Sequence, residues 1–356
     1  MIPVRALCGA VALILLSFSA LADTLRVASF NVELNRDGPG VLLRDIRRGK
    51  DAQIAAVVQV IARTAPDILA VQGFDWDYDG VALAAFVDLL RDAGVDYPYT
   101  YAPQPNAGLA SDLDLDGDGR TGGPGDAQGF GAFSGRGGMA VLSRFAILPD
   151  QARDYSALLW RDLPNALLPQ HPDGTPFPSS EALEIQRLSS TGHWLVPIRL
   201  PDGVGMTLMT FQAGPPVFDG AEDRNGRRNH DEILFWRKLL DGAFPPPVTG
   251  RFVLAGGGNL DPNDSDGRQV AIRTLLTDRR LQDPQPRSDG AAMADDQGHE
   301  GDNALDTVDW PRVGRLRVDY VLPSADWQVA GAGVYWPAPG MDGREMALTA
   351  SRHRLV

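Results

Sequence analysis

Apolar and polar residues follow two periods along this chain, and together the periods predict a layered α/β protein. Alternation and short apolar runs predict strands over residues 25–32, 68–71, 97–101, 138–143, 194–200, 206–211, 252–255, 316–322 and 328–335, and the start of another at 353–356. Helical spacing with start and stop signals predicts helices over 51–64, 81–93, 226–240 and 268–276. This alternation of strands and helices favours sheets covered by helices.

Two long stretches interrupt the regular pattern. Residues 103–137 are rich in glycine and aspartate and predict a long loop, whereas 150–190 predicts an irregular surface insertion. A structureless loop of such length is unusual in a compact domain and is often functional or ion-bound. The chain shows neither an internal repeat nor a linker composition, so we expect one domain over residues 23–356.

The first 22 residues have the pattern of a signal peptide. Arg5 gives a positive start, residues 6–16 are apolar, and Ala20-Leu21-Ala22 is a small-residue cleavage site. A short buried helix or a membrane anchor is the alternative, but the apolar run is short for a bilayer. The only cysteine, Cys8, lies inside this segment, so the mature chain has no disulfide. We expect export to a bacterial periplasm or the medium, with no membrane attachment after cleavage.

The charge of the chain restricts its partners. The net charge is −13, and removal of Arg5 with the leader brings it to −14. Such a field disfavours high-affinity nucleic-acid binding, although a small phosphate ester stays compatible with it. The only lysines, Lys50 and Lys238, stand outside any P-loop pattern, which excludes a Walker-type nucleotide site.

Five segments occur in an order typical of one family. They are Leu25–Asn31, Gly137–Arg144, Phe252–Asn259, Arg317–Leu322 and Ser351–His353. Together they resemble the endonuclease/exonuclease/phosphatase family over about residues 25 to 356. The resemblance implies a four-layer α/β sandwich, in which helices flank two facing mixed β-sheets (the DNase I-like fold). It also implies hydrolysis of phosphodiesters or phosphomonoesters with bound Mg²⁺ or Mn²⁺.

Four residues match site positions of that family. The resemblance places Asn31 beside the metal, Asn259 on the phosphate, and Asp319 and His353 in the catalytic cleft. We therefore take these four as the retained catalytic positions.

Four other positions depart from the family pattern. Gly73 stands where a metal-binding carboxylate is expected, and Gly257 where an aspartate orients the attacking water. Gln212 replaces a histidine and cannot carry a proton, and Arg352 replaces the aspartate expected beside His353. Because one positioned general base is worth about 10² to 10⁴ in rate, we expect weak or absent hydrolysis.

Neighbouring residues offer ways to rebuild such a site. Asp75 could supply the carboxylate missing at Gly73, although an acidic turn is the plainer interpretation, and Asp261 follows Asn259 in a predicted turn. The start of the helix at 226–240 carries arginines that could hold phosphate, or could form a solvated helix face. These arginines are Arg224, Arg227 and Arg228.

A second motif is independent of the family. Asp112, Asp114, Asp116 and Asp118 alternate around Gly117, as in the first half of an EF-hand loop. Glycine stands where the bidentate glutamate should follow, and Asp126 is the nearest acid. A structural Ca²⁺ and a flexible acidic loop are equal alternatives.

Three functional interpretations remain open. The chain is a secreted metal-dependent phosphoesterase with a rebuilt site, a non-catalytic descendant that binds a phosphate ester or a protein, or a structural protein that uses only the fold. Function has to be argued from the site, because one fold serves many functions.

Overall fold

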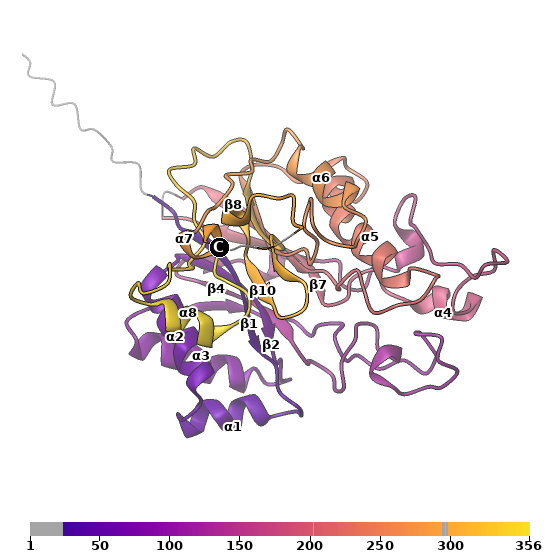
Figure 1. The fold of residues 1–356 in the computed structure, drawn as a ribbon, viewed down its shortest axis with the longest axis horizontal. Coiled ribbons are helices and arrows are strands. Elements are labelled where there is room, and N and C mark those ends of the chain that lie inside the picture. The colour runs from indigo at the N-terminus through magenta and orange to yellow at the C-terminus, as the bar shows by residue number, and fades with distance from the viewer. Residues whose placement is uncertain (1–23, 202, 294–295, 297) are drawn as a thin grey trace, which may run out of the picture.

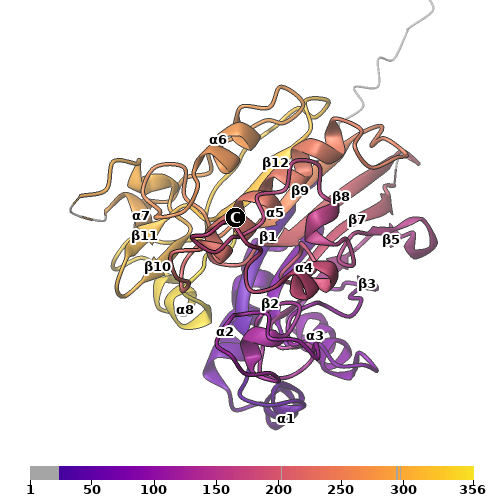
Figure 2. The same cartoon turned by 90° about the vertical axis from the view of Figure 1, so that its right-hand side faces the viewer.

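A computed structural model describes residues 24–201, 203–293, 296 and 298–356. The proposed signal peptide and Cys8 lie outside the described residues. Two mixed sheets face each other at the centre of the molecule, and helices cover the outer face of each (Figures 1 and 2). This is the four-layer α/β sandwich expected from the sequence.

The first sheet has the strand order β1-β2-β4-β3. Its strands are β1 (Val27–Leu34), β2 (Ile68–Phe74), β4 (Gly138–Ser143) and β3 (Tyr99–Tyr101). Strands β1 and β2 run parallel, whereas β4 is antiparallel to both of its neighbours. Helices on the outer face of this sheet are α1 (Val41–Arg48), α2 (Ala52–Thr64), α3 (Val81–Asp92) and α8 (Arg344–Ala350).

The second sheet has the order β12-β9-β8-β7-β5, with β6 also paired to β7. Its strands are β12 (Asp319–Pro323), β9 (Phe252–Gly257), β8 (Gly205–Gln212), β7 (Gly192–Arg199), β5 (Ala146–Ile147) and β6 (Arg153–Asp154). Only β8 and β9 run parallel. The remaining elements are the hairpin β10 (Val308–Trp310) and β11 (Gly314–Leu316), and helices α4 (Ser180–Ile185), α5 (Arg224–Leu240), α6 (Val270–Leu276) and α7 (Asp289–Ala292).

Three apolar clusters correspond to the spaces between the layers. One joins β1 and β2 to α2 and α3, another joins β8 and β9 to α5 and α6, and the third lies between the sheets. The third includes Val141, Trp194 and Val196, each fully buried. Burial of such side chains is the main force that holds the layers together. No helix among the described residues has the length and apolar character needed to cross a bilayer.

Most predicted elements are confirmed, with three differences. Residues 316–322 are divided between β11 and β12, and 328–335 form no strand. That last segment instead brings Val334 and Trp336 onto α7, where they form a small cluster with Val356. Residues 353–356 also form no strand, although the backbones of Val356 and Ser29 exchange two hydrogen bonds.

Helix α5 buries polar residues that fix the loops following β8 and β9. Asn229 Nδ2 donates to the carbonyls of Gly214 and Gly258 at 2.7 and 2.8 Å. The Glu232 carboxylate accepts from the amides of Ser190 and Gly214, and its burial raises its pKa to about 7. Of the three arginines predicted at the start of this helix, Arg228 is buried, whereas Arg224 and Arg227 are half-buried.

Candidate functional site

The candidate site, here called the cleft, lies where β1, β2, β8 and β9 end and where β12 begins. His353 Nδ1 is 2.8 Å from Asp319 Oδ2, and both side chains are buried. Thr307 Oγ1 donates to the same carboxylate oxygen at 2.9 Å, and the edge of Trp310 packs against the imidazole. These contacts fix the orientation of the His353 imidazole in the cleft.

The partner of His353 is therefore not at position 352. The resemblance led us to expect that Arg352 had replaced it, but Arg352 points to Glu33 on β1. The sequence motifs predicted Asp319 as a carboxylate of the site, but not as the partner of His353. Nothing in the sequence predicts its contact with Thr307. The dyad depends on β12 and the last residues of the chain meeting in space.

The side chain of Asn31 fills the space beside Gly73. Gly73 has a φ of +69° within a register shift of β2 against β4, a conformation that favours glycine. A Cβ added there would lie 3.1 Å from the Glu33 amide nitrogen and closer still to Asn31 Oδ1. Asn31 Oδ1 itself accepts from the Glu33 amide at 3.2 Å. A carboxylate side chain at position 73 would therefore require Asn31 to move.

Gln212 occupies the corresponding space beside Gly257. The two residues are register partners on β8 and β9. A Cβ at position 257 would lie 2.9 Å from Gln212 Cδ and closer still to Oε1, an atom that is buried and has no hydrogen-bond donor among the described residues. The space beside each of these glycines is thus occupied by the side-chain amide of a neighbouring residue.

Asn259 is held by the backbone of the adjoining loop. It has a φ of +50°, which asparagine tolerates better than most residues, and its Nδ2 donates to the Ala213 carbonyl at 2.8 Å. Its half-buried amide leaves Oδ1 as the group able to accept from a ligand.

The acids considered as replacements hold loops together. Asp75 accepts from the amides of Arg36 and Gly137, both at 2.8 Å. Burial raises the pKa of Asp75, and these hydrogen bonds partly offset the rise. Asp261 accepts from the amides of Asn263 and Arg317 at 2.6 and 2.7 Å. In this conformation all four carboxylate oxygens bind backbone amides.

The three arginines at the start of α5 also bind the protein itself. Arg228 is buried and donates to backbone carbonyls that include those of Leu188 and Gln128. Arg224 donates to the Leu115 carbonyl, and Arg227 Nε donates to that of Glu222 at 3.1 Å. These bonds hold α5 against neighbouring segments, and none of them reaches Asn31 or His353.

A protein-family model assigns the chain. The model described as the Endonuclease/Exonuclease/phosphatase family matches residues 28–353. The chain belongs to this family. No curated protein sequence matches the chain.

Solved structures of the family share the fold at low identity. A member from Beutenbergia cavernae DSM 12333 is 18% identical, covering 93% of this chain and 69% of its own, with a TM-score of 0.53. A family protein from Leptotrichia buccalis C-1013-b is 15% identical, covering 93% and 97%, with a TM-score of 0.50. Sphingomyelinase C from Streptomyces griseocarneus also matches, at 17% identity, 87% of each chain and a TM-score of 0.49.

The residues of the cleft are a poor match for the divalent metal that the family implies. A hard divalent cation prefers carboxylate oxygens. In the described part of the cleft, His353 and Thr307 both contact Asp319 Oδ2, while Asp319 Oδ1 has no donor, and Glu33 is bound by Arg352. The only group of three or more candidate ligands among the described residues lies elsewhere.

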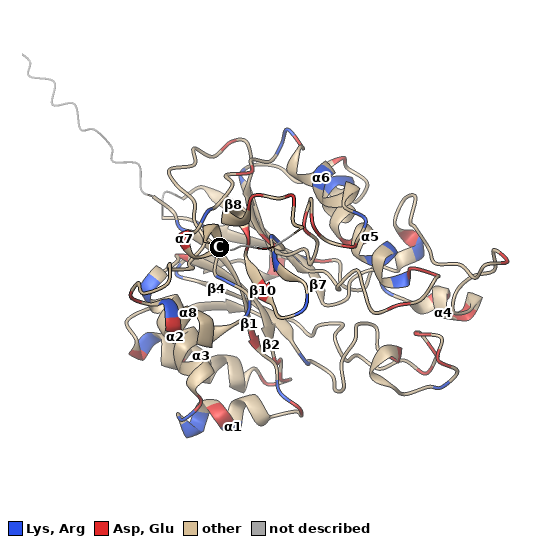
Figure 3. Ribbon diagram, in the orientation of Figure 1, with Lys and Arg blue, Asp and Glu red and all other residues tan. Residues whose placement is uncertain are grey.

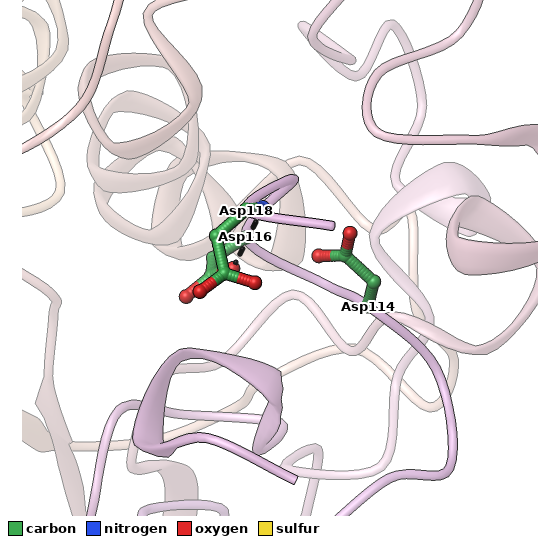
Figure 4. A group of neighbouring side chains, drawn as sticks. All are labelled: Asp114, Asp116 and Asp118. Carbon is green, nitrogen blue, oxygen red and sulfur yellow. Dashed lines mark hydrogen bonds between the residues drawn. The ribbon is translucent and has the colours of Figure 1, made fainter. Parts of the chain in front are cut away.

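That group is the acidic triad Asp114, Asp116 and Asp118, shown in Figure 4. Their ligand atoms lie within 4.8 Å of one another, which matches an EF-hand-like register beginning at Asp114. Asp112 stands outside the triad. Asp126 is close to this loop, where it accepts from the Leu115 and Gly123 amides at 3.0 and 2.7 Å.

Proposed function

We propose that this chain is an exported member of the endonuclease/exonuclease/phosphatase family that binds a phosphate ester and hydrolyses it weakly or not at all. The proposal rests on two positions where the family pattern has carboxylates and this chain has glycine, with a neighbouring side chain in the space beside each. The amides of Asn31 and Gln212 occupy the space at Gly73 and Gly257. Amides donate and accept hydrogen bonds, so they suit binding, but they neither take up a proton nor replace an anionic ligand.

The partner we propose is a small phosphate ester rather than a nucleic acid. The chain has a net charge of −13, and Figure 3 shows acidic and basic residues interspersed over its helices and loops. Polyanion binding depends on many basic contacts, whereas one phosphate requires only a few donors. Export is proposed from the leader pattern at residues 1–22.

The intact His353–Asp319 dyad favours a second candidate, a phosphoesterase with Mg²⁺ or Mn²⁺ that keeps measurable turnover.

For the triad Asp114, Asp116 and Asp118 we propose a bound Ca²⁺ that stabilises the long loop and takes no part in chemistry. The support for it is the clustering of three carboxylates in a loop with EF-hand spacing.

An activity assay separates the two candidates. The mature chain is assayed for phosphodiesterase and phosphomonoesterase activity with Mg²⁺, Mn²⁺ or Ca²⁺, beside the triple variant Gly73→Glu, Gln212→His, Gly257→Asp. We expect little or no turnover by the natural chain, and a gain once Arg352→Asp is added to the triple variant. Metal-dependent turnover by the natural chain, abolished by His353→Ala, would establish the enzyme instead.

A further inference from the structure

An ion pair stands beside the positions where the family's metal would bind. Arg352 donates its amide to Glu33 Oε2 at 2.7 Å and its Nε to Oε1 at 2.8 Å, and Nη2 also contacts Oε1. Ser351 Oγ is 3.0 Å from the same carboxylate and donates to the Asn31 carbonyl at 2.8 Å. Glu33, Asn31 and the C-terminal segment therefore form one connected cluster.

Glu33 is directly adjacent to the space at Gly73. Its Cα would lie 3.3 Å from a Cβ added at position 73. Glu33 has a φ of +48°, an uncommon value for a residue with a side chain, and such strain persists where surrounding contacts impose it. Burial raises the pKa of Glu33, but the hydrogen bonds of Arg352 and the charges of His353 and Arg352 outweigh burial and leave this pKa below its ordinary value. Glu33 is thus the anion of this cluster, and Arg352 is its counterion.

The charges of this cluster balance without a metal. Arg352 contributes +1 and Glu33 contributes −1, whereas Gly73 contributes no charge, so the ion pair is neutral by itself. A metal ion bound here would have to displace the guanidinium and would meet like charge from it.

Arg352 still has donors to offer. A guanidinium carries five N–H groups, and Arg352 uses two of them, on Nε and Nη2, for Glu33. No other protein acceptor of Arg352 side-chain hydrogens is seen in the described residues, and the side chain is 57% exposed. The remaining groups match the geometry of phosphate oxygens, which arginine binds by paired hydrogen bonds.

We propose that Arg352, held in place by Glu33, is the cation of this cleft and binds a phosphate group without a divalent metal. The inference rests on the proposed phosphate-ester binding and specifies how it occurs. Arg352 is a binding residue, and Glu33 is a positioning residue that acts through it.

Calorimetric titration tests the proposal with two probes, inorganic phosphate and phenyl phosphate. The mature chain is titrated once with EDTA and once with Mg²⁺. We expect the same dissociation constant within about twofold in both conditions, and at least a tenfold weakening in Arg352→Ala. Arg352→Lys keeps the charge but loses the paired geometry, so we expect an intermediate loss. Arg63→Ala, which removes an exposed arginine paired with Asp342, is the matched control and should bind like the natural chain.

The outcomes separate this inference from the proposed function. Binding that requires Mg²⁺ and survives Arg352→Ala would overturn the role of Arg352 while leaving phosphate binding in place. Absence of binding under both conditions would overturn both proposals.

A second measurement does not depend on phosphate. The double variant Gly73→Glu, Arg352→Asp removes the guanidinium of the ion pair and adds two carboxylates beside Glu33. We expect this variant to bind one more Mn²⁺ per chain than the natural protein, counted by electron paramagnetic resonance. An equal Mn²⁺ count in a folded double variant, or an extra cleft Mn²⁺ already present in the natural chain, would contradict the proposal.

Discussion

A methyl group added at Gly257 tests whether Gln212 fills the space in the cleft. In Gly257→Ala the new Cβ would lie 2.9 Å from Cδ and 3.0 Å from Nε2 of Gln212, whereas ordinary contact begins at 3.4 Å. Oε1 is closer still, so the amide has to withdraw by roughly 1 Å within a packed interior. Overpacking of this kind costs about 1–3 kcal/mol. Because the atoms that have to move are the far end of a flexible side chain, we expect Gly257→Ala to lower the free energy of unfolding by about 1–2 kcal/mol, in the lower part of that range.

The second half of the test removes the obstruction. In a Gln212→Ala background the amide is gone, so the methyl group at position 257 should cost no more than about 0.5 kcal/mol, and the double-mutant cycle should give an interaction energy of about 1–2 kcal/mol. Urea unfolding followed by tryptophan fluorescence measures all four proteins. Gly205→Ala on β8 is the control, since its Cβ would meet nothing nearer than 4.0 Å. An equal cost of Gly257→Ala in both backgrounds would refute the idea that Gln212 occupies this space.

Three further predictions concern acids outside the dyad. Asp75→Ala should destabilise the protein by about 2–4 kcal/mol, because the partly buried amides of Arg36 and Gly137 lose a charged acceptor. A calorimetric titration should show unchanged Mn²⁺ binding, and a lost Mn²⁺ site would mean that Asp75 is a ligand. Burial, with the charges of Asp261, Asp296 and Asp264, raises the pKa of Asp306 from 3.8 to about 8. A raised carboxyl pKa contributes stability that is complete below pH 3.8 and is lost as the pH rises to 8. The thermal midpoint of Asp306→Asn, relative to that of the natural chain, should therefore increase over this pH range. The exposed Asp150→Asn is the control and should show no such trend. Ca²⁺ should raise the thermal midpoint of the natural chain by several degrees and leave Asp114→Asn unchanged, and an equal rise in both proteins would place the ion elsewhere.

Regular periodicity made the layers predictable. Strand β4 was predicted with its observed bounds, and α2 and α3 to within one residue at either end. The error at 328–335 has a physical cause: its apolar residues are buried by packing onto α7, and the backbone makes isolated hydrogen bonds, such as Tyr335 to Leu355, instead of a ladder. Alternation reports burial, and burial does not require a partner strand.

The sequence alone determined which groups the cleft retains and which it lacks. Asn31, Asn259, Asp319 and His353 match ordered motifs, and glycine stands at positions 73 and 257, where the resemblance implies carboxylates.

Only the tertiary structure decided what those groups do. His353 pairs with Asp319, 34 residues away, and Arg352 pairs with Glu33, 319 residues away. Strand and helix periods follow from neighbouring residues, whereas a hydrogen-bond partner depends on which distant segments the packed sheets bring within about 3 Å. The contact between Glu33 and Arg352 therefore becomes apparent only once the first strand and the last residues are seen side by side.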